Sequence, residues 1–293
     1  MEAQIKNYYG IIKRILIIIL ALNWSCALAK IIYGLLTKCA SMTADGFHSL
    51  SDGASNIIGL VGISFACQPK DYDHPYGHKK YETLFSMAIA VILFAVCFGL
   101  VKQGIQRIIN PIIPNITIES FIIMLITLTI NIFVMNYEYR NGRKFNSDIL
   151  IADSMHTKAD IFTSISVIIS LIVIRLGFNI IDPIVTFIIA VFIGYTALQI
   201  IKNSSKILCD TAAILDVKRI SDIVLGVNGV KTCHKIRTRG RPDDINIDLH
   251  VQVNPNMHVD TAHKISYAIE EAIKKEIPQA SDVIVHIEPQ EKG

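Results

Sequence analysis

Long apolar stretches alternate with short polar segments over the first two thirds of the chain. Because a helix rises about 1.5 Å per residue, roughly 20 apolar residues are needed to cross about 30 Å of hydrocarbon. Stretches of about that length occupy residues 11–36, 43–67, 83–107, 116–138, 149–175 and 180–202. The pattern therefore predicts six membrane-spanning helices.

The pattern changes after Asn203, where charged residues return and the apolar runs shorten. The elements predicted there are a helix, two strands, a helix and a strand, at 215–226, 231–239, 245–253, 259–276 and 282–288. Apolar and polar residues alternate along the second strand, as expected where one face is buried. This α-β-β-α-β order predicts a small α+β domain, metallochaperone-like or ferredoxin-like, with helices on one face of a sheet.

We therefore expect a membrane domain at residues 1–208 and a soluble domain at residues 209–293. The composition agrees, since 52% of the 293 residues are hydrophobic and 18% are charged, against about 25% charged in a typical soluble domain. The net charge of +3 is spread over the loops, and no basic block indicates a nucleic-acid partner. The six cysteines form no CxxC pair, and a cytoplasmic domain is not expected to hold disulfides.

Basic residues near the membrane indicate which side each loop occupies. They gather at the N-terminus, after the second and fourth spans and after the sixth: Lys6, Lys13, Arg14, Lys70, Lys79, Lys80, Arg140, Arg143, Lys144, Lys202 and Lys206. Both termini are therefore predicted to be cytoplasmic, in a multi-pass protein of the inner or plasma membrane. A signal peptide cleaved after Ala29 is the alternative interpretation of the start, but apolar residues continue to Leu36 and favour a retained helix.

The second and fifth spans each carry a histidine and an aspartate four residues apart, His48 with Asp52 and His156 with Asp160. Residues with this spacing lie on one face of a helix. Two such helices facing each other would present two imidazoles and two carboxylates, a set that can hold one tetrahedral divalent ion. Because burying these groups without a cation is costly, metal or proton binding is favoured over a structural role. The set suits Zn²⁺ and accepts Co²⁺, Cd²⁺ or Fe²⁺, whereas Mn²⁺ prefers more oxygen.

Other acidic residues and histidines lie nearby. Asp45 and Asp153 each precede one of the span histidines by three residues. They either orient the imidazoles or are acids at the start of a helix, and both interpretations stay open. The loop after the second span holds Asp71, His74 and His78, which form a second candidate metal site with a more accessible ion.

The C-terminal part holds a third candidate metal site. His234, His250 and His286 lie on three different predicted strands, and His263 lies on the helix between two of them. Clustering is plausible because neighbouring strands in a sheet lie about 5 Å apart. Glu288 follows His286 by two residues and so shares its strand face. We therefore predict that this set binds metal.

Four segments of the chain together resemble the cation diffusion facilitator family: Ala44–Asp52, Asp73–Glu82, Asp153–Asp160 and Val283–Pro289. The resemblance extends over essentially the full length, and members of this family export divalent transition metals from the cytoplasm. It implies a transport site of His48, Asp52, His156 and Asp160, a loop site of Asp71, His74 and His78, and a binuclear cytoplasmic site of His234, His250, His263 and His286. Some members have Asp at the position of Glu288.

The resemblance also implies a homodimer, in which a loop Lys pairs with an Asp after the sixth span. Lys80 and Asp210 stand at those positions. Imidazole titrates near pH 6.5 as a rule, and metal needs neutral imidazole and ionised carboxylate. The sequence therefore predicts a secondary transporter that exports Zn²⁺-like ions in exchange for protons, with a C-terminal domain that binds metal and regulates transport.

The metal and the class of protein are open to alternatives. Relatives that look like manganese or iron exporters carry similar His and Asp pairs, so Mn²⁺, Fe²⁺, Co²⁺ and Cd²⁺ are alternatives to Zn²⁺. A membrane metalloenzyme is a second class, although the chain has no HExxH or GxSxG motif. A membrane metal sensor, which binds without transport, is a third. We expect no catalytic residue and no cofactor other than the metal.

Overall fold

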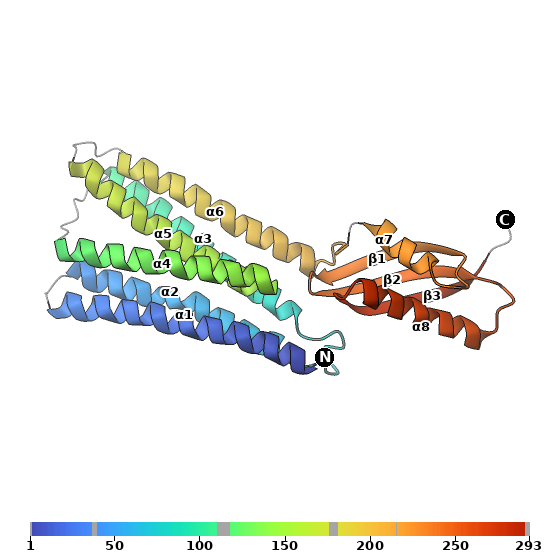
Figure 1. Cartoon of the computed structure of the whole chain (residues 1–293). Coiled ribbons are helices and arrows are strands. Elements are labelled where there is room, and N and C mark those ends of the chain that lie inside the picture. Colours follow the sequence, from blue (N-terminus) through green and yellow to red (C-terminus); the bar gives the residue numbers. More distant parts are fainter. Residues whose placement is uncertain (1, 37–39, 110–117, 176–180, 215, 291–293) are drawn as a thin grey trace. The chain divides into compact units, whose positions relative to one another are not determined.

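The computed structural model describes residues 2–290 apart from 37–39, 110–117, 176–180 and 215. The chain divides into an N-terminal unit of residues 1–204 and a C-terminal unit of residues 205–293. Helices that follow the predicted spans build the first unit: α1 (Glu2–Leu36), α2 (Ala40–Ala66), α3 (Lys80–Ile109), α4 (Ile118–Phe145), α5 (Asp148–Arg175) and α6 (Ile181–Leu208) (Figure 1).

Four of the described helical segments are long and apolar enough to cross a membrane: Tyr8–Tyr33 in α1, Lys80–Gln106 in α3, Phe121–Phe145 in α4 and Thr186–Leu208 in α6. In α2 the described part includes a shorter apolar stretch, Gly53–Ala66. Parts of α2 and α5 fall outside the described residues, and these two helices carry the acidic residues and histidines of the candidate transport site. That these two helices also span the membrane stays a prediction.

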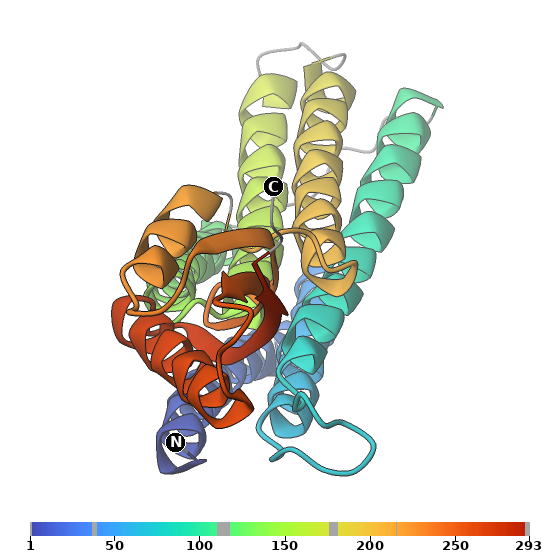
Figure 2. The ribbon, with the colours of Figure 1, turned by 90° about the vertical axis from the view of Figure 1, so that its right-hand side faces the viewer.

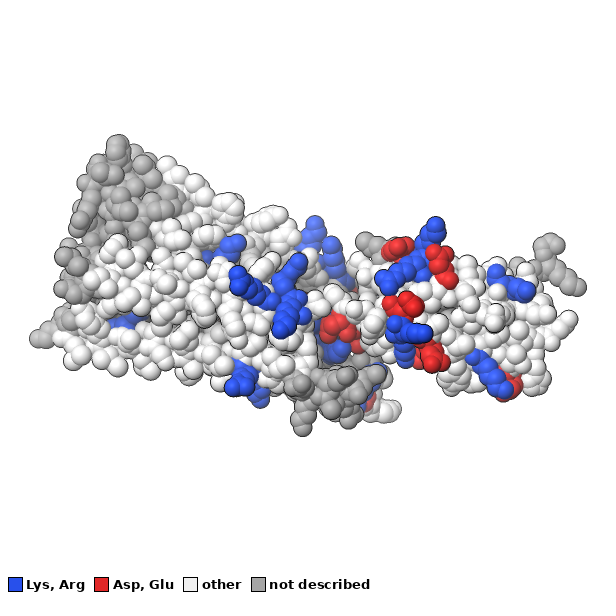
Figure 3. Space-filling view, viewed as in Figure 1, with Lys and Arg blue, Asp and Glu red and all other residues white. Residues whose placement is uncertain are grey.

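The outward side chains of the N-terminal unit are largely apolar. Phe98 is 76% exposed and Val191 is 71% exposed. Figure 3 shows that broad areas of the visible face of these helices carry no charged side chain. An apolar surface of this extent suits a hydrocarbon environment, since water would favour its burial.

Close packing brings α2 against α3 and α5. A Cβ added at Gly62 of α2 would lie 2.6 Å from the Cβ of Phe85 in α3 and 2.8 Å from the Cδ1 of Ile149 in α5. Glycine leaves this space free, so the three helices approach one another closely. The polar positions of α2 that lie near α5 can therefore contact it directly.

The C-terminal unit contains α7 (Val217–Leu225), β1 (Thr232–Arg241), β2 (Asp244–Val253), α8 (Val259–Glu276) and β3 (Ala280–Pro289). The sheet has the order β1-β2-β3, with β1 antiparallel and β3 parallel to the central strand. The two helices cover one side of the sheet (Figures 1 and 2). This is the predicted α-β-β-α-β order.

Alternation along β2 separates the core of this unit from its polar face. The buried core joins Ile247 and Val251 of β2 to Ile220 of α7 and Ile269 of α8. The intervening residues of β2, including His250, lie on the opposite face of the sheet. The helices thus fill one face and leave the histidine-bearing face open.

Candidate metal centres

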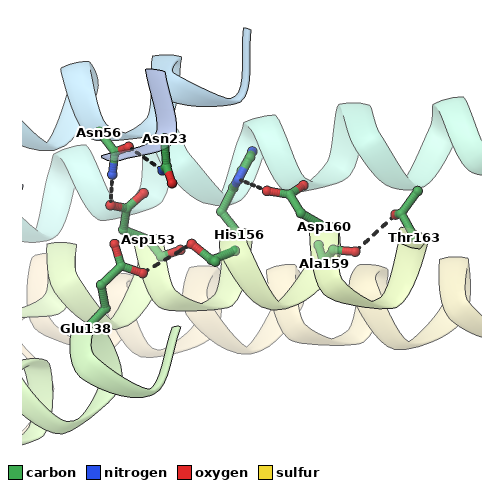
Figure 4. Close-up of polar contacts among 9 residues, drawn as sticks. Asn23, Asn56, Glu138, Asp153, His156, Ala159, Asp160 and Thr163 are labelled. Atoms are coloured by element: carbon green, nitrogen blue, oxygen red, sulfur yellow. Dashed lines mark hydrogen bonds and ion pairs between the residues drawn. The ribbon is translucent and has the colours of Figure 1, made fainter. Parts of the chain in front are cut away.

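A polar network joins four helices inside the apolar N-terminal unit (Figure 4). Asn23 of α1 donates to the Oδ1 of Asn56 in α2 at 3.2 Å. The Nδ2 of Asn56 in turn donates to the Oδ2 of Asp153 in α5. One turn further along the same face of α5, Thr157 donates to the Oε2 of Glu138 in α4 at 3.1 Å. The network fixes the α2 and α5 helices against each other at the level of the candidate transport site.

His156 and Asp160 lie on one face of α5, one turn apart, as their spacing predicts. The Nδ1 of His156 is 3.5 Å from the Oδ2 of Asp160. His156 is 3% exposed, and Asp160 is partly buried. An imidazole nitrogen and a carboxylate oxygen are therefore directed into the same small space, as two ligands of one ion would be.

His48 and Asp52 lie in α2, but their side chains, like that of Asp45, fall outside the described residues. The described neighbours set the register of the two helices. Asn56 bonds Asp153, and Ser49 bounds the same small cavity as Asp160. Positions 49 and 56 are two turns apart on one face of α2, and position 52 falls between them. The turn of α2 that carries the predicted pair is therefore level with the His156–Asp160 turn of α5.

Sequence reasoning missed two buried charged residues of this region. Glu138 is the last residue of the fourth apolar stretch, and the sequence alone assigns it no role. The α4 helix continues to Phe145, and Glu138 is 0% exposed, with its carboxyl group turned toward Asp153 (Figure 4). Lys30 is also buried within the first span. An ionisable residue inside an apolar stretch is the signal that could have identified both.

The loop residues Asp71, His74 and His78 come together at the start of α3. The two oxygens of Asp71 lie 3.1 Å from the Nδ1 of His74 and 3.4 Å from the Nε2 of His78. One ligand atom from each residue lies within 4.8 Å of the others. Gly77 adopts a φ of 91°, a conformation that glycine reaches without strain and that folds the loop back on itself. The group can hold a metal ion near the surface.

The environment of Asp71 favours its ionised form. Partial desolvation acts to raise its pKa, but hydrogen bonds from the backbone and ring of His74, with the charges of His74 and His78, hold the pKa below its ordinary value. The backbone N–H of His74 donates to the Oδ1 of Asp71 at 2.6 Å. Asp71 is therefore available as an anionic ligand under ordinary conditions.

The C-terminal cluster lies on the open face of the sheet. The backbone register places His234 beside His250 and His250 beside His286, across all three strands. Glu288 bridges two of them, with its Oε1 2.7 Å from the Nδ1 of His250 and its Oε2 3.1 Å from the Nε2 of His234. The ligand atoms of these three residues lie within 4.8 Å of one another. A glutamate at this position thus reaches two histidines at once.

A β-bulge helps to aim His234. The β1–β2 register shifts between His234 and Arg237, and Lys235 adopts a φ of 49°. Bulges of this kind redirect neighbouring side chains. His234 therefore reaches Glu288 although the two residues lie on the two edge strands.

His286 and His263 are placed less centrally. The ring centroid of His286 is 4.6 Å from that of His250, but its Nε2 is 3.7 Å from the nearer oxygen of Glu288. His263 is exposed on α8 and packs edge-on against Tyr267. It bounds an open groove together with His286 and Glu288. The structure does not bring His263 into the compact group, because α8 covers the other face of the sheet.

Hydrogen bonding from His250 lowers the pKa of Glu288, aided by the charges of His250, His234 and Lys235 and opposed by partial desolvation. Since the folded-state pKa is depressed, this carboxylate stabilises the fold above the pKa of an unfolded glutamate. The contribution is lost as the pH falls through the folded-state value. The environment of Glu288 therefore favours its anionic form.

We expect the carboxyl signal of Glu288, followed by NMR in metal-free residues 205–293, to titrate below the ordinary glutamate pKa of about 4.3. His250→Ala should raise the midpoint, because it removes the main hydrogen bond. His258→Ala, outside the cluster, should leave it unchanged. A wild-type midpoint at or above the ordinary value would contradict the geometry.

Lys80 and Asp210, the predicted dimer pair, belong to different units. Lys80 is the first residue of α3, and Asp210 follows α6 with a φ of 53°. Their pairing between two copies of the chain stays a prediction.

Comparisons with known proteins follow the same division of the chain. Residues 16–209 match the family described as "Cation efflux transmembrane domain", and residues 215–290 match "Cation efflux protein, cytoplasmic domain". A solved structure of a MamM CTD is 28% identical, with a TM-score of 0.25, and covers 25% of this chain and 94% of that one.

Full-length relatives come from distant organisms. An uncharacterized transporter of Methanocaldococcus jannaschii is 28% identical over 94% of this chain and 98% of its own length. The manganese efflux system protein MneS of Bacillus subtilis is 28% identical over 90% of each chain. The cation-efflux pump FieF of Citrobacter koseri is 29% identical over 89% of this chain and 87% of its own.

The transmembrane family match covers well over half of the chain. Together with the match to the cytoplasmic domain, it confirms the predicted fold class, a membrane-spanning helical domain followed by a small cytoplasmic α+β domain, and the inferred resemblance. The chain belongs to the cation diffusion facilitator family of divalent metal exporters, and it is a multi-pass membrane protein.

Proposed function

We propose that this chain exports Zn²⁺ from the cytoplasm in exchange for protons. The transported ion binds His48 and Asp52 of α2 together with His156 and Asp160 of α5. The observation that carries this proposal is the buried His156 beside Asp160, whose side chain lines a small polar cavity inside an apolar helical unit. The matching turn of α2 lies at the same level.

The ligand types supply the coupling to protons. A metal ion binds neutral imidazole and ionised carboxylate, so loading releases protons and protonation releases the metal. A site that faces the cytoplasm loads metal, and a site that faces the other side exchanges it for protons. His156 is the group suited to this exchange, because the ordinary pKa of imidazole lies near physiological pH.

Manganese is the second candidate cargo. Two nitrogen and two oxygen ligands favour Zn²⁺, whereas Mn²⁺ prefers sites richer in oxygen. The neighbouring carboxylates of Asp153 and Glu138 and the amide of Asn56 make this region oxygen-rich. One relative is named a manganese efflux protein. Fe²⁺, Co²⁺ and Cd²⁺ are further possible cargoes for the same site.

The remaining sites regulate transport in this proposal. Both termini are cytoplasmic, and the protein acts as a homodimer, with Lys80 of one protomer paired with Asp210 of its partner. The group of His234, His250 and Glu288, extended by His286 and His263, binds metal when its cytoplasmic level rises. The resulting bias on the conformation of the dimer is of the order of 1–3 kcal/mol.

Competitive transport by the purified chain in proteoliposomes tests the proposal. Zn²⁺ uptake is followed with a metal-sensitive dye and proton movement with a pH-sensitive dye, while Mn²⁺, Fe²⁺, Co²⁺ or Cd²⁺ compete outside. We expect Zn²⁺ uptake with proton movement in the opposite direction, and weaker competition by Mn²⁺. Faster transport of Mn²⁺ would favour the second candidate, and metal binding without flux would identify a sensor instead.

A further inference from the structure

A buried lysine lies beside the proposed transport site. Lys30 belongs to the apolar α1 segment Tyr8–Tyr33, yet it is 7% exposed. Lysines near the ends of membrane helices usually extend toward the headgroups. Lys30 instead turns into the bundle, where its ammonium group donates to the Oγ of Ser49 in α2 at 2.9 Å. Burial of an ammonium group is costly unless an opposite charge nearby compensates it, so the surroundings of Lys30 must supply a negative charge.

The cavity that Lys30 lines also contains a carboxylate, that of Asp160. Its volume is about 30 Å³, which is room for about two water molecules. Lys30, Ser49, Thr157 and Asp160 all line it, together with polar residues of α1 and α4. Lys30 and Asp160 therefore border one small, partly enclosed space, in which opposite charges attract more strongly than in bulk water.

The position of Ser49 ties Lys30 to the predicted ligands of α2 as well. Ser49 directly follows His48 and lies one turn before Asp52 along the helix. The Lys30–Ser49 hydrogen bond therefore fixes a positive charge at the level of both His-Asp turns. A divalent cation that enters between α2 and α5 meets this charge.

We propose that the Lys30 ammonium group is a tethered counter-cation of the transport site. It balances the charge of Asp160 while the site holds no metal, and it is displaced when the metal binds. This inference rests on the proposed function. It adds that the Lys30 ammonium group, a part of the chain itself, competes with the metal ion for Asp160. Lys30 lowers the affinity for the metal and thereby speeds release of the ion.

Transport by the full chain in proteoliposomes tests this role, with Zn²⁺ and Mn²⁺ each used as cargo. Lys30→Met should lower the half-saturating metal concentration by about tenfold, within the usual range of coupling between two sites. It should also reduce the maximal rate, because release becomes slower. Lys30→Arg, which keeps the charge, should retain both wild-type values.

Lys13→Met is the matched control, since Lys13 is an exposed lysine of the same helix. It should change neither value. If Lys30→Met fails to fold, Lys30→Gln keeps a donor for Ser49 without the charge and should also lower the half-saturating concentration.

An unchanged or higher half-saturating concentration in the uncharged variants would overturn the inference. So would an equal effect of Lys30→Arg, which would indicate packing rather than charge. The proposed function would survive such a failure of the Lys30 variants, provided that wild type transports metal and Asp160→Asn does not. If wild type transports neither metal, the proposed function and this inference both fail.

Discussion

Replacing Asp160 with Asn is expected to abolish metal transport in proteoliposomes, with a loss of about 100-fold or more. Changes to groups that only orient a ligand already cost 10–100-fold as a rule, and Asp160 is proposed to bind the ion itself. Its carboxylate faces the Nδ1 of His156 at 3.5 Å and borders the polar cavity between the helices. Asparagine keeps the size of the side chain but removes the anionic charge.

Asp148→Asn is the control for this variant, because Asp148 begins the same helix and accepts a hydrogen bond from Thr83. It should retain transport. Size-exclusion chromatography and circular dichroism should show that both variants fold. Wild-type transport by a folded Asp160→Asn protein would exclude Asp160 from the transport site.

Glu288→Gln is expected to lower the Zn²⁺ affinity of the C-terminal unit by about 100-fold, on the same grounds. Glu288 is the only carboxylate in the compact group, among the described residues, and it contacts both His234 and His250. Calorimetric titration of residues 205–293 measures this effect, because that unit has its own hydrophobic core.

Three comparisons make the second prediction specific. Glu271→Gln, on the exposed side of α8, should leave the affinity unchanged. His286→Ala should have an intermediate effect, and His263→Ala the smallest effect of the cluster variants, because His263 lies outside the compact group. Equal losses for His263→Ala and Glu288→Gln would mean that metal binding rearranges α8 toward the sheet.

The periodicity of the sequence was sufficient to predict side-chain directions where one helix or strand alone determines them. Alternation along 245–253 predicts a buried face and a polar face, and the same alternation places His250 opposite the helices. The four-residue spacing of His156 and Asp160 likewise predicts a shared helix face. In both cases the backbone alone decides which way the side chains point.

The periodicity of the sequence was insufficient to predict burial where the packing of one helix or strand against another determines it. Glu138 at the end of an apolar stretch is equally compatible with an exit to water, and only the packing of α4 against α5 buries it. The sequence likewise places Lys30 within a span but does not show that its side chain points into the helical bundle. That orientation depends on a hydrogen bond to Ser49 of another helix. The place of His263 depends on which face of the sheet α8 covers, which its own sequence does not specify.

The central claim is that a divalent metal binds between α2 and α5, and zinc X-ray absorption spectroscopy tests it most directly. The sample is the full chain carrying Asp71→Asn and Glu288→Gln, which weaken the other two sites, loaded with one equivalent of Zn²⁺. The account predicts nitrogen and oxygen ligands only, at about 2.0–2.1 Å, and loss of the bound zinc in Asp160→Asn. A sulfur ligand at about 2.3 Å, which Cys26 in the same cavity could supply, or zinc retained in Asp160→Asn, would contradict it.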